Sequence, residues 1–540
     1  MLKKYYVSIL LLLFTLITIF LHLFKPTIPC INADDVSFGY NAYSIATTGK
    51  DEYGVSFPLR FKAFGENKLP VLAYLAAPFT KILGTTDLAI RLPLHLVGMM
   101  FPILMFALSL QLFKSKNIAL ITAFLTSVSS WIQITTRHGH EVPLATFFIV
   151  CGLIALLKYA DTKKLSYLVT FSLLNGIALF TYHLAKMMQP FLLGWLLFYT
   201  FFQKSNTKHH WKKILLIFIL PILLFVYTEY KNPSNRIGNL VFYQNEGFKQ
   251  NIQQKRIESN NPLFYNIATE GIQVLSKNYF TYLSPYYLSF VGDENPRFWY
   301  AEMGPITPVE YLFLLIGLYF LFKNNHKYKY FLLTFLLWSP LSAALSWAEL
   351  SITRNFMSVV PILLIVSYGI FAFIKGAPTK TSKLLILFVV GSVFVFFRVG
   401  TWDFYFNHYS KRPLVIRATE CGYSELADYI KLNYDKFDRF YITKEHGQPY
   451  MHLLYQLQFP PEKYQSQATL SEPDKYGFGQ VENFDKFVFH VPNELNEKKV
   501  VYIGYPWEIR SRPGFKPDVD EANIKTIRVG SEEIFTILER

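Results

Sequence analysis

Hydrophobic residues in this sequence are gathered into long blocks, and polar residues fall between them. An α-helix needs about 20 mostly apolar residues to cross a bilayer. Blocks near that length span residues 9–24, 88–113, 118–134, 142–157, 165–180, 187–202, 214–227, 308–322, 331–347, 356–374 and 384–397. The pattern predicts an α-helical polytopic membrane protein with about 11 transmembrane helices. A shorter apolar run at 71–83, flanked by proline, predicts a helix that lies in the interface or re-enters it.

Lysines mark alternate loops between the blocks. They lie at 3–4, 114–116, 163–164, 204–213, 323–329 and 375–383. Short basic loops stay in the cytoplasm, so we expect a multi-pass plasma-membrane protein with a cytoplasmic N-terminus. An odd number of spans then places the C-terminus and the loops 25–87 and 230–307 outside. The first block is long, and no small-x-small site precedes Asp34, which favours a retained anchor over a cleaved signal peptide.

The pattern changes near residue 400. The segment 400–540 is rich in charged residues, Pro and Gly and has no membrane-length block. Strand-like runs at 440–443, 500–503 and 533–538 alternate with a helical pattern at 423–433. We therefore expect a transmembrane domain at 1–399, which includes the outer loop 25–87, and a soluble extracytoplasmic α/β domain at 400–540. No catalytic constellation is evident in the second domain.

Composition agrees with a membrane protein. Only 17% of the residues are charged, and the mean hydropathy is +0.23. The net charge of +15 would suit a nucleic-acid partner, but the predicted cytoplasmic lysines account for much of it, so none is expected. Cys30 and Cys421 would both face outward and could pair, whereas Cys151 lies in a block. No CxxC, HExxH, GxGxxG or Walker pattern occurs, so we expect no nucleotide-binding fold.

Polar and charged residues gather at the outer ends of the blocks. An acidic pair, Asp34-Asp35, follows the first block, where carboxylates near lipid are costly. The other candidates are Tyr40, Lys68, Arg91, Arg137, His138, His140, Glu141, His183, Lys186 and Arg354. Plain structural explanations exist for all of them: an exposed acidic loop, basic side chains that reach the headgroups, or an Arg137–Glu141 pair on one helix face. A metal site made of His138, His140 and Glu141 is a further alternative, although these three side chains cannot all point one way on a helix.

Several of these segments resemble a known family. Asn-Ala-Asp-Asp-Val-Ser-Phe-Gly-Tyr-Asn-Ala-Tyr-Ser-Ile, at 32–45, resembles the first-loop signature of bacterial glycosyltransferases of the family 39 type. Such enzymes are similar to protein O-mannosyltransferases and to the lipid A aminoarabinose transferase, all of the GT-C fold. Further matches are Phe64-Gly65, Lys68-Leu69-Pro70, Arg91-Leu92-Pro93 and the segments 137–141, 292–297 and 354–356. The resemblance covers roughly residues 1–400 and implies the fold and the enzyme class, not the sugar.

The resemblance also implies roles for individual residues. The family's first-loop Asp acts as the catalytic base, and Asp34 matches it, while Asp35 replaces the usual Glu. Lys68 takes the place of the family's lysine that contacts the lipid phosphate, although Leu69 departs from the Lys-Pro-Pro pattern. The acid after the third span matches Glu141. The expected catalytic residues are therefore Asp34, Asp35 and Glu141. The expected substrate-binding residues are Lys68, Tyr40, Arg91, Arg137, His140, His183, Lys186 and Arg354.

The residue chemistry suits transfer of a sugar from a polyprenyl-phosphate donor to a hydroxyl group. Fixed positive charge would hold the departing phosphate, and a carboxylate would take the proton of the acceptor hydroxyl. Adjacent carboxylates do not resemble the opposed pair of a glycosidase, so we expect single displacement with inversion. The acceptor could be a protein, a glycan or a glycolipid, and a divalent metal is not indicated. The alternative is a transporter or lipid flippase without transferase chemistry; such proteins often show internal repeats, and none is evident.

Overall fold

The computed structural model describes residues 2–540 except 65, 203–210, 234–240, 260, 301–302, 347–349 and 473–480. By its contacts the chain divides into two compact units. The helical unit comprises Met1–Phe24 and Leu94–Phe404, and the mixed unit comprises Lys25–Pro93 and Tyr405–Arg540. The contacts thus group the predicted outer loop with the C-terminal segment. The predicted basic loop at 204–213 lies mostly outside the described residues.

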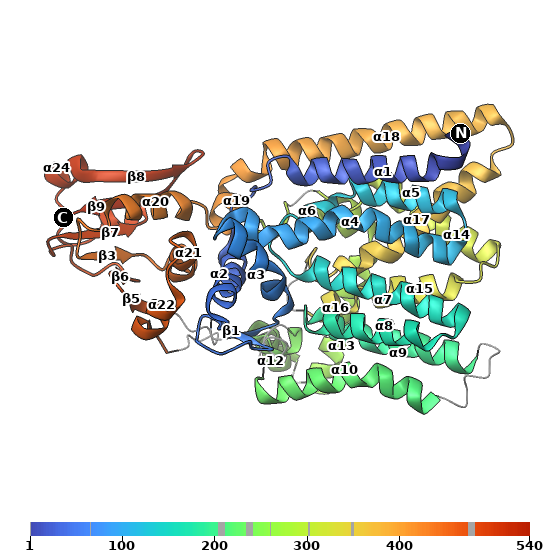
Figure 1. The fold of residues 1–540 in the computed structure, drawn as a ribbon, viewed down its shortest axis with the longest axis horizontal. Helices are drawn as coiled ribbons and strands as arrows, with labels where there is room; N and C mark the ends of the chain where they lie inside the picture. The colour runs from blue at the N-terminus through green and yellow to red at the C-terminus, as the bar shows by residue number, and fades with distance from the viewer. Residues whose placement is uncertain are drawn as a thin grey trace. The chain divides into compact units, whose positions relative to one another are not determined.

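Long helices running side by side make up the helical unit (Figure 1). Its helices are α1 (Leu2–Leu23), α4 (Asp87–Phe113), α5 (Lys116–Val128), α6 (Ser130–Thr135), α7 (Val142–Thr162), α8 (Leu165–Leu179), α9 (Leu184–Phe201), α10 (Trp211–Lys231), α12 (Glu246–Ser259), α13 (Ile267–Leu283), α14 (Pro308–Lys323), α15 (Lys329–Trp338), α16 (Leu341–Ala344), α17 (Val359–Gly376) and α18 (Lys380–Asn407). A π-helical turn, η3, covers Tyr286–Val291, and short 3-10 turns lie at Phe242–Gln244 and Phe356–Ser358. Helix α4 begins, and α18 ends, in residues assigned to the mixed unit.

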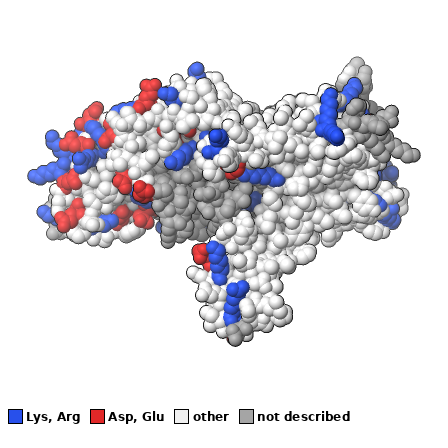
Figure 2. Space-filling view, turned by 90° about the horizontal axis from the view of Figure 1, so that it is seen from below, with Lys and Arg blue, Asp and Glu red and all other residues white. Residues whose placement is uncertain are grey.

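Each predicted block contains helix among the described residues, but block 118–134 is divided between α5 and α6, and block 331–347 between α15 and the short α16. Among those residues, six helices are long and apolar enough to cross a membrane: Tyr5–Leu23, Asp87–Phe113, Val142–Thr162, Trp211–Lys231, Phe356–Gly376 and Lys380–Lys411. Shorter apolar helices lie at Val71–Leu83, Lys116–Val128 and Leu165–Leu179. The charged side chains of the helical unit gather toward its ends, and the surface between them is almost uncharged (Figure 2). A polytopic helical membrane protein is therefore confirmed.

Close packing of α14 on α17 depends on two glycines. A Cβ atom added at Gly317 would lie 2.2 Å from the carbonyl oxygen of Ile365, and one at Gly369 would lie 2.4 Å from that of Phe313. Small residues let helix backbones approach this closely in a bilayer, where dispersion contacts drive association. These two helices thus form a fixed part of the scaffold that presents the loops at their ends.

The mixed unit combines the segment after α1 with the C-terminal segment. Its first part contains α2 (Ala33–Thr48), a small hairpin of β1 (Phe61–Ala63) and β2 (Glu66–Lys68), and α3 (Val71–Leu83). Its second part contains η5 (Tyr409–Lys411), α19 (Pro413–Ala418), α20 (Tyr423–Asn433), β3 (Arg439–Ile442), α21 (Pro449–Gln456), α22 (Pro461–Gln467), β4 (Thr469–Leu470), β5 (Val481–Phe484), β6 (Phe487–Val488), β7 (Val500–Gly504), α23 (Pro506–Arg510), α24 (Pro517–Asp520), η6 (Glu521–Asn523), β8 (Ile524–Val529) and β9 (Glu532–Glu539).

A seven-stranded mixed sheet organises the second part, in the order β4-β5-β6-β3-β7-β9-β8. Strand β3 pairs in parallel with β6 and β7, and the other pairs are antiparallel. All five residues of β7 are buried, as expected of a central strand covered on both faces. The predicted strands at 440–443, 500–503 and 533–538 and the predicted helix at 423–433 are confirmed by β3, β7, β9 and α20.

A disulfide joins the two parts of the mixed unit. Cys30 and Cys421 are bonded, with their Cα atoms 5.4 Å apart, across 391 residues of sequence. The sequence left this pairing open, and the structure forms it. Because Cys30 precedes α2 by only a few residues, the bond holds the start of α2 to the C-terminal segment.

Candidate functional site

The acidic pair lies in the first turn of α2. Asn32 caps this helix, and its side-chain oxygen accepts hydrogen bonds from the backbone N–H groups of Asp34 (2.9 Å) and Asp35 (3.3 Å). The free N–H groups of a first helical turn carry partial positive charge and favour carboxylates. The local sequence Asn-Ala-Asp-Asp therefore starts a helix and stabilises two negative charges at its end.

Asp34 forms an ion pair with Lys68, the last residue of β2. The Lys68 Nζ atom lies 2.8 Å from Asp34 Oδ1. The lysine is only 3% exposed, whereas the Asp34 side chain is 34% exposed. The ammonium also lies over the rings of Phe38 and Phe64, at 4.9 and 4.8 Å from their centroids. The result is a buried, fixed cation beside a carboxylate that is partly exposed to solvent.

Asp35 has a different environment from its neighbour. Its Oδ2 atom accepts a hydrogen bond from Arg91 at 2.9 Å, and both side chains are buried. The same guanidinium donates to the carbonyl oxygens of Pro29 (2.7 Å), Cys30 (3.0 Å) and Thr27 (3.3 Å). Arg91 thus fastens the segment before α2 to the helix itself. This geometry favours a positioning role for both residues, and the catalytic role expected of Asp35 and the substrate contact expected of Arg91 stay predictions.

Two further polar residues lie buried along α2. Tyr40 donates its hydroxyl hydrogen to the carbonyl oxygen of Phe459 at 3.0 Å. Asn41 exchanges two hydrogen bonds with Glu52, at 2.9 Å to its carboxylate and 3.0 Å from its backbone N–H. Burial raises the pKa of the Glu52 carboxyl to about 8, and the nearby Lys68 opposes that rise. The sequence analysis did not single out Glu52, because no sequence signal marks this loop carboxyl as buried.

A second set of predicted residues belongs to the helical unit. The segment 137–141 forms the turn between α6 and α7, so the helix face expected to carry an Arg137–Glu141 pair is not formed there. Arg137 is buried and donates to the carbonyl oxygens of Leu21 and Phe24. The Nδ1 atom of His140 lies 3.7 Å from the Glu141 carboxylate. Arg137 is therefore held by the backbone, and the substrate contacts expected of Arg137 and His140 and the catalytic role expected of Glu141 stay predictions.

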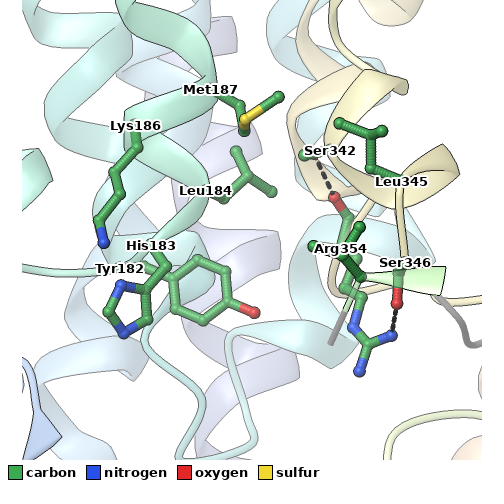
Figure 3. A pocket seen from close by; sticks show the side chains of 10 residues that line it. Tyr182, His183, Leu184, Lys186, Met187, Ser342, Leu345, Ser346 and Arg354 are labelled. Atoms are coloured by element: carbon green, nitrogen blue, oxygen red, sulfur yellow. Dashed lines mark hydrogen bonds between the residues drawn. The ribbon is translucent and has the colours of Figure 1, made fainter. Parts of the chain in front are cut away.

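A cavity of about 130 Å³ gathers three of the predicted residues (Figure 3). His183 and Lys186, at the start of α9, lie on one wall, and Arg354 lies on the opposite wall. Lys186 pairs with Glu229 at 3.0 Å, and Arg354 donates to Ser346. The rest of the lining is mainly apolar, with Leu184, Met187, Val241 and Leu345. Two cations on an apolar cavity suit a ligand with an anionic group and a hydrocarbon part.

The motif at 292–297 supports the loop that carries Arg354. Asp293 accepts hydrogen bonds from the backbone N–H groups of Ile352 and Asn295, both at 2.8 Å. Burial raises the pKa of this carboxyl to about 6. A Cβ at Gly292, whose φ is +69°, would lie 2.4 Å from the carbonyl oxygen of Met303. Asp293 thus fixes the loop that carries Ile352 and Arg354, and the close approach of the Met303 carbonyl oxygen requires glycine at 292.

Comparison with known proteins gives a family and a fold. Residues 67–227 match the family described as dolichyl-phosphate-mannose-protein mannosyltransferase. ArnT from Cupriavidus metallidurans in the apo state has a similar fold, with a TM-score of 0.52 and 10% identity, over 100% of this chain and 98% of that one. The same enzyme bound to undecaprenyl phosphate gives 0.52 and 11%, over 98% and 97%. No curated protein matches the sequence.

A longer protein shows a weaker likeness. The oligosaccharyltransferase AglB from Archaeoglobus fulgidus, in complex with an inhibitory peptide and a dolichol-phosphate, has a TM-score of 0.46 and 13% identity over 84% of this chain. This chain spans 64% of that protein's length.

Among the described residues no group of three or more His, Cys, Asp or Glu side chains could hold a metal ion. The family match and the fold bear out the resemblance found in the motifs. Residues 67–227 of this chain thus match the family described as dolichyl-phosphate-mannose-protein mannosyltransferase, and the chain as a whole has the fold of ArnT.

Proposed function

We propose that this chain transfers a sugar from a polyprenyl-phosphate donor to a hydroxyl acceptor on the outer face of the plasma membrane, with inversion at the anomeric carbon. The observation that carries the proposal is the Asp34–Lys68 pair at the start of α2. Of the four charges clustered there, only Asp34 has substantial exposure, at 34% against 3% or less for the other three. Asp34 is therefore the group that acts as the base.

The proton transfer follows from this geometry. The acceptor hydroxyl donates a hydrogen bond to Asp34 as its oxygen attacks the anomeric carbon, and the carboxylate takes the proton. The bond from that carbon to the phosphate oxygen breaks on the opposite side, and the lipid phosphate leaves. One carboxylate and one displacement give inversion, and Asp35, paired with Arg91, is not available as a nucleophile.

Cations within each of the two units have the chemistry that binds a lipid phosphate. Lys68 supplies a fixed ammonium that stabilises growing negative charge on the leaving phosphate. The cavity lined by Lys186 and Arg354 has the chemistry for a phosphate joined to a prenyl chain, and His183 lies on the same lining. The ArnT structure with undecaprenyl phosphate shows that a protein of this fold binds such a lipid. A protein, glycan or glycolipid hydroxyl can each serve as acceptor.

An Asp34→Asn variant tests the assignment of the base. It keeps the shape of the side chain and the membrane insertion, and transfer should fall by about 10²–10⁴-fold. The control is Asp428→Asn, which also removes a carboxylate paired with a lysine in the mixed unit but at a 72% exposed position. The assay is transfer of labelled sugar from polyprenyl-phosphate donors in proteoliposomes. Near-normal turnover by Asp34→Asn would remove it as the base, and lipid movement without transfer would support a flippase.

The topology is a second part of the proposal. We propose about 11 spans, a cytoplasmic N-terminus and an external C-terminus, supported by the lysine-rich alternate loops. Reporters fused after Lys116 or Lys380 should read cytoplasmic, and one fused after Arg540 should read external. A cytoplasmic reading at Arg540 would show that one span has been miscounted.

A further inference from the structure

We propose that Glu420 in the C-terminal segment is a positioning residue for the catalytic carboxylate. This inference rests on the proposed function, because it takes Asp34 as the base. It gives the C-terminal segment a role in the reaction, where the sequence showed no catalytic constellation. The residues that carry it all belong to the mixed unit.

Glu420 holds the first backbone N–H group of α2. Its Oε2 atom accepts a hydrogen bond from the N–H of Ala33 at 3.0 Å, and Ala33 directly precedes Asp34. The N–H groups of a first helical turn have no partner within the helix. The Asn32 side chain accepts hydrogen bonds from the N–H groups of Asp34 and Asp35. Glu420 accepts the one from Ala33, across 387 residues of sequence. Three successive backbone N–H groups around the base are thus fixed by two side chains.

The Glu420 carboxylate is itself held in place. His452 donates from Nε2 to the same Oε2 atom at 2.7 Å, and the two side chains are 6% and 1% exposed. The imidazole stacks on the ring of Tyr423, with centroids 4.1 Å apart and planes 8° from parallel. A Cβ at Gly447 would lie 2.3 Å from the Glu420 carboxyl carbon, so the carboxylate fills the space beside that glycine. Buried polar groups fixed on several sides hold one geometry.

A covalent link supports the same contact. The residue after Glu420 is Cys421, which is bonded to Cys30 in the segment that leads into α2. The hydrogen bond from Ala33 and the disulfide therefore join the same two chain segments within a few residues. A misplacement of about 1 Å at a reacting group can cost about 10²-fold in rate. Loss of the Glu420–Ala33 hydrogen bond should therefore displace Asp34 and lower the rate of transfer.

The first test compares two buried carboxylates of the mixed unit. Asp520 matches Glu420 closely, because it also accepts a backbone N–H bond, from Lys516 at 2.6 Å, and pairs with a base, Arg540, at 2.7 Å. Glu420→Ala should lower kcat by about 10–100-fold and leave the donor KM within about twofold. Asp520→Ala should lower thermal stability to a similar extent and leave kcat nearly unchanged. Equal kcat losses in the two variants would show that Glu420 only supports folding.

Two milder variants separate positioning from folding. Glu420→Gln keeps an oxygen for the Ala33 N–H and should recover most of kcat. Glu420→Asp keeps the charge but withdraws the carboxylate by one methylene, and should lower kcat by about tenfold with the disulfide formed and the melting temperature near that of the parent. If Glu420→Ala fails to fold, Glu420→Asp decides, and a parental kcat for it would overturn the proposal.

A double variant ties the effect to the base. In an Asp34→Asn background there is no base to position, so adding Glu420→Ala should lower the residual rate by less than about threefold, far from the product of the single effects. A full multiplicative loss would overturn the positioning role.

The outcomes also separate this inference from the proposed function. An active Asp34→Asn protein would refute the assignment of Asp34 as the base. An inactive Asp34→Asn protein together with a parental kcat for Glu420→Ala would refute only the positioning role of Glu420.

Discussion

Replacing Arg91 by methionine should loosen the start of α2 without touching the reacting carboxylate. The Arg91 guanidinium is buried and binds four acceptors: the Asp35 carboxylate and the carbonyl oxygens of Thr27, Pro29 and Cys30. Methionine fills a similar volume but donates no hydrogen bond. The variant therefore leaves one buried carboxylate and up to three carbonyl groups without this donor.

The expected magnitude follows from burial. Both partners of the Arg91–Asp35 pair are nearly inaccessible, at 0% and 2% exposure, so solvent screens them little. Breaking a buried pair by removing one partner costs about 3–5 kcal/mol, because the other charge stays buried. Since each 1.4 kcal/mol is about a factor of ten, a loss of about 4 kcal/mol should raise local opening of α2 by about 10³-fold.

Hydrogen exchange of the backbone amides in 33–48 measures this opening. The control is Arg417→Met, which removes a guanidinium paired with Glu532 at 2.7 Å but is itself 62% exposed. Exposed pairs contribute about 0–1 kcal/mol, so the control should change exchange by less than about tenfold. A second substitution, Asp35→Leu, added to Arg91→Met should restore part of the protection, since it removes the stranded charge. Exchange in α2 within about threefold of the parent in Arg91→Met alone would refute the reasoning.

Three further predictions concern neighbouring groups. Lys68→Ala should raise the donor KM and lower kcat by about 10²-fold, and Lys68→Arg should recover part of it; unchanged kinetics with a short-chain donor would remove Lys68 from the site. Burial raises the pKa of Glu52 from 4.5 to about 8. Between these two pH values the folded chain holds a proton that the unfolded chain has released, so the free energy of unfolding falls as the pH rises. Glu52→Gln should flatten that slope in thermal melts from pH 5 to 9 and raise stability at the alkaline end, and an unchanged slope would contradict the burial of this carboxyl. Cys421→Ser should lower unfolding stability by about 2–5 kcal/mol and remove the sensitivity of the melting temperature to reducing agent, whereas a melting temperature equal to the parent's would show that the disulfide adds no stability.

The sequence was informative where local patterns decide structure. Apolar blocks of membrane length become helices because a bilayer leaves the backbone few other ways to satisfy its hydrogen bonds. The helix that begins after Asn32 was not predicted, because the segment 25–87 was expected to be an outer loop, although an Asn followed by two acids is a helix cap with favourable charges. The segment 137–141 shows the limit of this approach, because the assumed helix face is replaced by a turn between α6 and α7.

The partners of the predicted residues depend on the tertiary structure. The sequence placed Asp34 and Asp35 side by side and could not separate their roles, whereas the structure pairs one with Lys68 in reach of solvent and buries the other against Arg91. Neither the burial of Glu52 nor the contact of Glu420 with Ala33 has a sequence signal.

The sequence by itself thus determined a polytopic helical protein, a family resemblance and the acids at the start of α2. Those features follow from interactions between residues close in the chain and from the demands of the bilayer. Only the tertiary structure decided which carboxylate stays accessible and which side chain anchors it, because contacts across 387 residues form only when distant segments pack together. Burial then sets the free-energy penalty for each charged side chain, and this burial cannot be read from the local sequence.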